Sequence, residues 1–140
     1  MAVPTRLLSP LEPLFEREAD FIVARGTGGE FGVLPGHAPL LTWLKPGELM
    51  VRHDQKEEFF FLEGGYVEVL PNRVTILANR GVPVSQLDPS TAEDARRAAE
   101  DAIAKAVNPG PDDLAELERQ LEIANFRLQA AERDRRRRRD

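Results

Sequence analysis

The feature that most constrains the fold of this chain is an abrupt change in sequence pattern near Val84. Eight of the nine aromatic residues precede that point, and only Phe126 follows it. Proline and glycine are frequent before Val84 and sparse after it, apart from a cluster at 108–111. Short apolar runs bounded by turn residues are typical of strands, whereas apolar positions at helical spacing are typical of helices. We therefore predict a β-rich domain at 1–84 and a helical domain at 85–140.

The first domain contains short apolar runs with the pattern of strands. Turn residues separate four of these runs, at 19–25, 58–62, 66–70 and 74–77. No helical pattern lies between neighbouring runs, so their connections are expected to be hairpins and not the helical crossovers of βαβ units. The pattern therefore predicts an antiparallel β-sandwich or barrel.

The segment 29–48 combines repeated glycine and proline with clusters of apolar residues. Glycine permits turns with positive φ, and proline fixes φ and lacks a donor, so these residues predict corners. The apolar pairs between the corners are Val33-Leu34, Leu40-Leu41 and Trp43-Leu44. Because all three pairs are strongly apolar, we expect the segment to fold back several times onto a hydrophobic interior.

Two helices are predicted in the second domain. Asp88 followed by Pro89 suits a helix start, because aspartate is a common N-cap and proline fits the first helical position. The alanine stripe of this helix consists of Ala92, Ala95, Ala99, Ala102 and Ala106. After the breaker at 108–111, Asp113 and Glu116 have the spacing of a capping box for the second helix. The stripe of the second helix consists of Leu114, Leu117, Leu121, Ala124, Leu128 and Ala131.

These two stripes predict an antiparallel helical hairpin with a weak seam. Apolar residues that recur at alternating spacings of three and four are typical of helices packed along one another. Alanine facing leucine lets the helix axes approach closely, but it buries little apolar surface, which stabilises by about 25 cal/mol per Å². We therefore expect the hairpin to undock, extend or repack more readily than the sandwich.

Composition and motifs argue against several classes of function. The chain has no cysteine, which excludes disulfides and thiolate sites, and its formal charge of −5 disfavours nucleic-acid binding by the whole protein. His37 and His53 lack the spacing and carboxylate support of a metal site. No serine has the context of a catalytic nucleophile. No apolar run approaches the roughly 18 residues of a membrane span, and the N-terminus lacks the features of a signal peptide.

The C-terminus carries a run of five arginines: Arg135, Arg136, Arg137, Arg138 and Arg139. Such a tail suits nucleic acid or an anionic membrane surface. The same composition suits a solvated helix end, where cations interact favourably with the helix macrodipole. No aromatic residue is interleaved with the arginines, so base stacking is not supported. On the residues alone, both readings stay open.

Three blocks of the sequence resemble the epsilon subunit of the F-type ATP synthase. They read GEFGVLPGHAPLLTWLKPGEL, EEFFFLEGGYVEVLPNRVTILAN and LDPSTAEDARRAAE. The resemblance extends from Leu8 to about Glu100, and the helical segment beyond it also fits. It implies a flattened antiparallel β-sandwich followed by two helices, in a non-catalytic subunit of the central rotor. It also implies the gamma subunit and the membrane c-ring as partners, and helices that in many members restrain ATP hydrolysis.

The resemblance assigns a c-ring contact to the loop that carries GEFG and LPGH. Glu30, Phe31 and His37 are the candidate contact residues at these positions. A loop pinned by proline and glycine loses little further entropy on docking, which suits a contact that must transmit torque. The alternative is that Glu30 and His37 are exposed turn residues.

The gamma subunit is expected to cover apolar sandwich residues that the isolated chain cannot bury. The candidates are Trp43, Phe59, Phe61 and Tyr66. Alternation along a strand sends one set of side chains inward and the other outward, and the register that separates the two sets is not given by the sequence. Packing in the core is the alternative for each of them.

One departure from the family bears on nucleotide binding. Some epsilon subunits bind ATP with an Ile/Leu-Asp-x-x-Arg-Ala motif at the start of the first helix. Residues 87–92 match this motif at Leu87, Asp88 and Ala92 but place Thr91 at the arginine position. A threonine hydroxyl offers one donor and no charge, whereas a guanidinium offers five donors and a fixed charge. We therefore expect no ATP cofactor, unless Arg96 or Arg97 replaces the missing arginine.

Together these observations predict a non-enzymatic subunit that, with gamma, couples proton-driven rotation of the c-ring to ATP synthesis in the catalytic head. The hairpin is expected to inhibit ATP hydrolysis through contacts of the arginine run with the alpha and beta subunits. The expected location is the cytoplasmic face of the bacterial cell membrane, as a peripheral part of the complex and without nucleic acid. The alternative is a free-standing β-sandwich adaptor whose basic tail contacts nucleic acid or an anionic membrane surface.

Overall fold

The structure of the protein is a computed structural model that describes residues 1–139. Asp140, the last residue of the predicted helical domain, lies outside the described residues. The chain divides into two compact units, one at Met1–Pro83 and one from Val84 onward, so Val84 belongs with the helices. Each unit is described below by itself.

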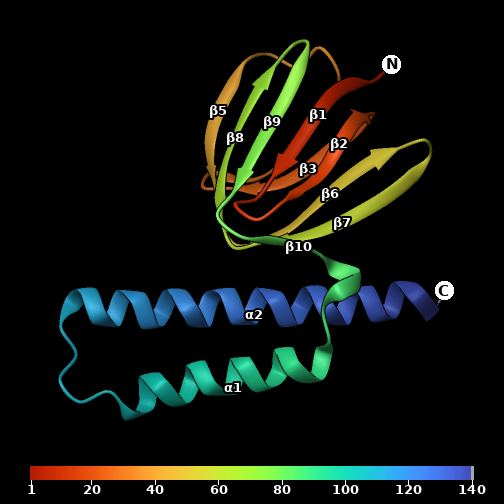
Figure 1. Cartoon of the computed structure of the whole chain (residues 1–140). Helices are drawn as coiled ribbons and strands as arrows, with labels where there is room; N and C mark the ends of the chain where they lie inside the picture. The colour runs from red at the N-terminus through yellow and green to blue at the C-terminus, as the bar shows by residue number, and fades with distance from the viewer. Residues whose placement is uncertain (140) are drawn as a thin grey trace. The chain divides into compact units, whose positions relative to one another are not determined.

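Within the described residues, the first unit holds ten strands (Figure 1). They are β1 (Val3–Leu8), β2 (Pro13–Ala19), β3 (Phe21–Gly26), β4 (Gly29–Val33), β5 (Leu40–Leu44), β6 (Gly47–His53), β7 (Lys56–Leu62), β8 (Gly65–Leu70), β9 (Arg73–Ala78) and β10 (Gly81–Pro83). Strands β3, β7, β8 and β9 correspond to the four predicted runs. The sequence pattern did not predict β1, β2, β6 and β10, and in β1 and β2 polar residues and prolines interrupt the apolar positions.

The strands form a sandwich of two layers. One layer has the order β10-β7-β6-β3-β4 and the other has the order β5-β8-β9-β1-β2, and the pair Gly26 and Leu44 joins them. Neighbouring strands are antiparallel, as predicted, except that β1 lies parallel to β9. This exception arises because β1 and β9 are far apart in sequence, so no short turn dictates their direction.

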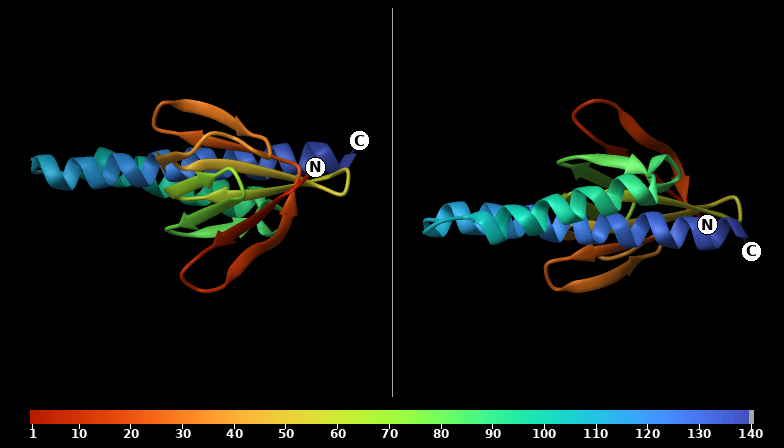
Figure 2. Two further views of the ribbon diagram at one scale, coloured as in Figure 1. Left: turned by 90° about the horizontal axis from the view of Figure 1, so that it is seen from above. Right: turned by 90° about the horizontal axis from the view of Figure 1, so that it is seen from below.

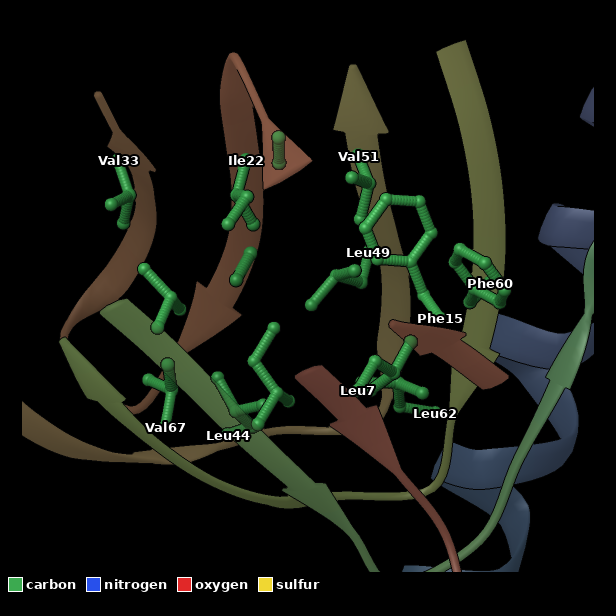
Figure 3. Close-up of a cluster of buried hydrophobic side chains, with 14 of the residues drawn as sticks. Leu7, Phe15, Ile22, Val33, Leu44, Leu49, Val51, Phe60, Leu62 and Val67 are labelled. Carbon is green, nitrogen blue, oxygen red and sulfur yellow. The ribbon is translucent and has the colours of Figure 1, made fainter. Parts of the chain in front are cut away.

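The core lies between the two layers and contains inward-facing side chains of β1 to β9. Figure 3 shows Leu49 and Val51 of β6 beside the ring of Phe15 from β2. The rings of Phe15 and Phe60 meet edge to face at 6.4 Å. Full burial of a side chain of this size stabilises the fold by about 1.5–3 kcal/mol, so these contacts contribute strongly to the stability of the first unit.

The expectation that all three apolar pairs of segment 29–48 are buried is wrong. Val33 and Leu44 belong to the core, but Leu34, Leu41 and Trp43 are 60%, 69% and 66% exposed. The reason is that much of the segment is strand, in β4 and β5, and side chains of a strand alternate between the two faces. One member of each apolar pair therefore points outward.

The second unit contains the 3-10 turn η1 (Val84–Gln86) and the helices α1 (Pro89–Lys105) and α2 (Pro111–Arg139). The predicted helix start is confirmed, because Asp88 is the N-cap of α1 and Pro89 its first residue. The two helices run side by side as a hairpin in all views (Figures 1 and 2). Asn108 adopts a positive φ of 47° in the connection between them.

The predicted capping box of the second helix is wrong. The backbone N–H of Leu114 donates to the carbonyl of Gly110, so α2 already begins at Pro111 and Asp113 lies inside its first turn. The side chain of Glu116 accepts hydrogen bonds from Arg119 and Gln120. Proline at the first helical position decided this start, because its fixed φ suits a helix and its missing N–H costs nothing there.

The helices follow the predicted stripes in part, and Ile123 and Ala130 of α2 are buried outside them. Ala92 of α1 and Ala124 and Ala131 of α2 are buried. Ala102 is exposed, and the neighbouring Ile103 is half-buried in its place. A helix has 3.6 residues per turn, so a stripe read from alanines alone moves off the contact face after a few turns.

Candidate partner-binding surfaces

A row of apolar side chains crosses the outer face of the second layer. Trp43 of β5 pairs with Tyr66 of β8, Tyr66 pairs with Leu77 of β9, and Leu77 pairs with Leu8 of β1. The rings of Trp43 and Tyr66 meet edge to face with centroids 5.5 Å apart. Trp43 is 66% exposed and Tyr66 is 38% exposed. We call these four residues the apolar row.

The next row of the same face includes the exposed Leu41 of β5 and is otherwise polar. Glu68 of β8 pairs with Thr75 of β9, which pairs with Arg6 of β1. Arg6 forms an ion pair with Glu16 at 3.2 Å, and both side chains are exposed. An exposed apolar patch with a polar rim is typical of a protein interaction site, so the apolar row is the best candidate for one.

The structure divides the four candidate gamma-binding residues into two groups. Trp43 and Tyr66 face outward in the apolar row. Phe59 and Phe61 alternate along β7 with the core residues Phe60 and Leu62, so they lie on the opposite face of that strand. Phe61 is nonetheless buried and Phe59 is half-buried. Phe61 therefore does not offer an exposed surface. For this residue the structure supports the alternative of packing inside the protein.

Glu30 and Phe31 lie in β4, the outer strand of the first layer. Glu30 is exposed and pairs with Arg25 of β3. The guanidinium of Arg25 donates to the carbonyl of Pro46 at 2.6 Å, which connects this hairpin to the turn before β6. The ring of Phe31 packs against Gly26, where an added Cβ would lie 3.0 Å from it. The hairpin is therefore well supported, and Glu30 extends from it into solvent.

His37 does not share a loop with Glu30, contrary to the sequence expectation. Strand β4 separates them and advances by about 10 Å from Glu30 to Val33 alone. His37 lies in the turn after β4, where its Nδ1 is 2.6 Å from the carbonyl of Ala38. The same turn contacts the connection between β8 and β9, because the N–H of Gly36 donates to the carbonyl of Pro71. Glu30 and His37 therefore belong to different parts of the chain, one to β4 and one to the turn that follows it.

The start of α1 is built as a helix cap. The N–H and the hydroxyl of Thr91 donate to Oδ2 of Asp88 at 3.2 and 2.7 Å. These hydrogen bonds, with the hydroxyl as the larger cause, lower the pKa of Asp88 below its usual range. The residue at the motif arginine position therefore stabilises the helix end instead of offering a charge to a ligand.

Arg96 and Arg97 are already paired along α1. Nη2 of Arg96 lies 2.6 Å from Glu93, its Nη1 pairs with Glu100, and Nε of Arg97 lies 3.1 Å from Glu93. The hydrogen bond from Arg96 is the main cause that lowers the pKa of Glu93 to about 2. A nucleotide phosphate would have to compete with these carboxylates for both arginines.

The arginine run forms the last turns of α2, which is helical through Arg139. Four of its members, Arg136 to Arg139, lie in the last turn, where positive charge favours the helix dipole. Arg138 pairs with Asp134 at 2.7 Å and donates to the carbonyl of Ser85 at 3.0 Å. The run is therefore an ordered cationic helix end and not an extended tail.

Within residues 1–139, no group of three or more histidine, aspartate or glutamate side chains gathers as a metal site. His53 is buried at the end of β6, with its ring against Phe15 at 5.1 Å. Its Nε2 lies 2.5 Å from Glu58. His53 therefore contributes to packing at this end of the sandwich, and His37 lies in a different turn.

Comparison with known proteins agrees with this architecture. The family model described as ATP synthase, Delta/Epsilon chain, beta-sandwich domain matches residues 3–84. The ATP synthase epsilon chain of Alkalilimnicola ehrlichii is 39% identical over 132 residues, which cover 94% of this chain and 93% of that protein. The chain belongs to the ATP synthase epsilon chain family. The epsilon chain 2 of Ralstonia nicotianae is 41% identical over 129 residues and covers 91% of both proteins.

Solved structures show the same fold within ATP synthases. A chain in the Euglena gracilis mitochondrial ATP synthase OSCP/F1/c-ring structure matches with a TM-score of 0.79 and 28% identity, over 93% of this chain and 81% of that one. A chain in the Tetrahymena thermophila central stalk/c-ring structure matches with a TM-score of 0.71 at 14% identity and supports the fold. The protein is an epsilon-type subunit, and such subunits are non-catalytic. No described helix is long and apolar enough to cross a membrane.

Proposed function

We propose that this epsilon subunit docks onto the gamma subunit through the apolar row and so joins the central stalk. The observation that carries the proposal is the exposure of Trp43 beside Tyr66, on a face whose next row is polar apart from Leu41. An isolated subunit gains nothing from exposing a tryptophan at 66%, whereas a large rigid aromatic residue is a frequent anchor of protein interfaces. The test is the Trp43 substitution described in the Discussion.

The second contact in the proposal is with the c-ring, through the hairpin of β3 and β4. Glu30 extends from this hairpin into solvent, and the contacts of Arg25 and Phe31 support the hairpin. A supported hairpin loses little entropy on docking, which suits a contact under torque. With gamma, this contact would couple proton-driven rotation of the ring to ATP synthesis. His37, beyond the other end of β4, fits a separate contact.

The third element of the proposal is inhibition of ATP hydrolysis by the helices. The seam between α1 and α2 consists largely of alanine and half-buried leucine, so its separation exposes little apolar surface. The arginine run would then present a cationic helix end to acidic loops of the alpha and beta subunits. Charge pairing there would oppose rotation in the hydrolysis direction.

Deleting residues 112–140 is expected to raise ATP hydrolysis by the reconstituted catalytic head severalfold. Replacing Arg135, Arg136 and Arg139 by glutamine is expected to produce part of this rise. Added salt should also weaken inhibition, because the screening length falls from about 10 Å at 0.1 M to about 3 Å at 1 M. The assay is steady-state phosphate release with intact or truncated subunit. Unchanged hydrolysis after truncation would show that the hairpin has no inhibitory role.

Direct control by ATP is not part of the proposal. Thr91 is occupied in the helix cap, and Arg96 and Arg97 are paired with carboxylates. Calorimetric titration of the isolated chain with ATP is therefore expected to show no binding in the micromolar range. A clear micromolar isotherm that Arg96→Gln or Arg97→Gln abolishes would show that one of these arginines binds the nucleotide.

The proposed location is the cytoplasmic face of the bacterial membrane, where the subunit is held through the complex. The similar epsilon chains of named bacteria support this location. The alternative function, a free-standing adaptor with a basic tail for nucleic acid, is not favoured. The matched relatives extend over more than nine-tenths of the chain, including both helices, and they are ATP synthase subunits.

A further inference from the structure

The helix α2 is much longer than its partner in the hairpin. It spans 29 residues and α1 spans 17, which is a difference of about 18 Å at 1.5 Å per residue. The connection between Lys105 and Pro111 is short, so the end of α1 and the start of α2 lie together. The extra length therefore lies at the C-terminal end, where α2 runs past the start of α1 and contacts η1 (Figure 1).

The register of the seam selects one arginine on this extension. The stripe of α2 ends with Leu128 and Ala131 at alternating spacings of three and four residues. Its continuation falls on Arg135 and then on Arg138. Arg138 therefore lies on the side of α2 that faces α1 and the turn before it. Arg136, two residues earlier, lies about 200° away around the helix.

The contact of Arg138 is oriented and specific. Its Nη2 donates to the carbonyl of Ser85 in η1 at 3.0 Å, across 53 residues of sequence. The carboxylate of Asp134, only 16% exposed, holds the same group at 2.7 Å. Among the described residues, no backbone N–H donates to the Ser85 carbonyl, which accepts from the Arg138 side chain. Arg138 thus satisfies a carbonyl at the end of a 3-10 turn, as cations do at helix ends.

We propose that Arg138 has a retaining role: it holds the end of α2 on η1 and so stabilises the closed hairpin. The arginine run then contains two opposite roles. Arg138 favours the closed state, whereas Arg136, on the other side of α2, serves the contact with the catalytic head. The second role rests on the proposed inhibition, but the Arg138–Ser85 contact does not.

Amide hydrogen exchange of the intact chain tests the contact without any partner. Arg138→Ala is expected to speed exchange in the last two turns of α2 and in 85–88 by about threefold to tenfold, the range for one hydrogen bond with a charged donor at a surface. Arg136→Ala is the matched control, because it removes the same charge from the same helix end. It should leave exchange in 85–88 unchanged, and it should speed exchange in the last two turns of α2 less than Arg138→Ala, because only the favourable interaction with the helix dipole is lost. Equal acceleration in the two variants, or acceleration in neither, would overturn the proposal.

The two variants also separate the contact from the inhibitory function. In the reconstituted complex, Arg138→Ala should lower ATP hydrolysis, because the hairpin opens more readily, whereas Arg136→Ala should raise it. Arg138→Lys keeps the charge but loses the forked donor, and it should behave like Arg138→Ala in exchange, to a smaller extent. If exchange changes as expected and hydrolysis does not, the Arg138–Ser85 contact stands and the proposed inhibition fails. If hydrolysis rises in both variants, Arg138 belongs to the inhibitory surface and the retaining role is wrong.

Discussion

Replacing Gly65 by alanine is expected to destabilise the sandwich by about 3 kcal/mol or more, enough to unfold a domain of ordinary stability. Gly65 begins β8 with a φ of +145°, a conformation that residues with a Cβ rarely adopt. An added Cβ would lie 2.0 Å from the carbonyl oxygen of Leu77 and 2.9 Å from Cα of Ala78. Both atoms belong to the backbone of β9, so relief requires separation of two paired strands. Urea unfolding followed by circular dichroism measures the effect.

Gly28 provides the matched control for this substitution. It lies in the turn between β3 and β4, and an added Cβ there would meet no atom within 4 Å. Gly28→Ala is therefore expected to change the unfolding free energy by less than about 0.5 kcal/mol, as for an ordinary surface site. A Gly65→Ala protein as stable as the Gly28→Ala protein would contradict the described approach of β8 to β9.

Replacing Trp43 by aspartate is expected to weaken binding to the gamma subunit by about 30-fold to 1,000-fold, or about 2–4 kcal/mol. Trp43 stands at the outer end of the apolar row and contacts Tyr66 through its ring edge. A carboxylate at this position would have to lose its water against an apolar partner surface. Because Trp43 is 66% exposed in the isolated subunit, the unfolding midpoint of the Trp43→Asp variant should stay close to that of the wild-type chain. Surface plasmon resonance with purified gamma measures the affinity.

Leu34→Asp is the control for this second experiment. Leu34 is 60% exposed, so the substitution makes a similar chemical change in the turn after β4, outside the apolar row. It should leave the affinity for gamma within about twofold. Equal affinity of the Trp43→Asp and wild-type chains would exclude the apolar row as the gamma contact. Joint loss of affinity and thermal stability would instead mean that Trp43 supports the fold of the sandwich.

Several features of the protein could be predicted from local sequence because local physics determines them. Asp88 and Pro89 start α1 through their own capping oxygen and fixed φ, with no need of a distant contact. The runs that became β7, β8 and β9 are bounded by residues that turn the chain. The division near Val84 follows from a change of period, and the family resemblance rests on ordered blocks. All of these signals lie within a few residues of the element that they specify.

Other predictions failed because they relied on the spacing of residues in the sequence, whereas contacts with a neighbouring segment determined the structure. The stripe of alanines led to Ala102, but the true helical period places Ile103 at the seam. Glu30 and His37 lie close in sequence, yet β4 extends between them because β3 offers it a complete ladder of hydrogen bonds. The capping box at Asp113 had the right spacing and lost to an earlier start at Pro111.

The sequence by itself determined that this chain forms a β-sandwich followed by a helical hairpin, and which family it belongs to. Only the tertiary structure decided which apolar residues face outward, because strand register depends on pairing between residues far apart in the chain. That pairing places Trp43 beside Tyr66 on an exposed face and leaves Phe61 buried. It was likewise the antiparallel packing of two unequal helices that brought Arg138 to Ser85, a contact between residues whose local sequences carry no sign of each other.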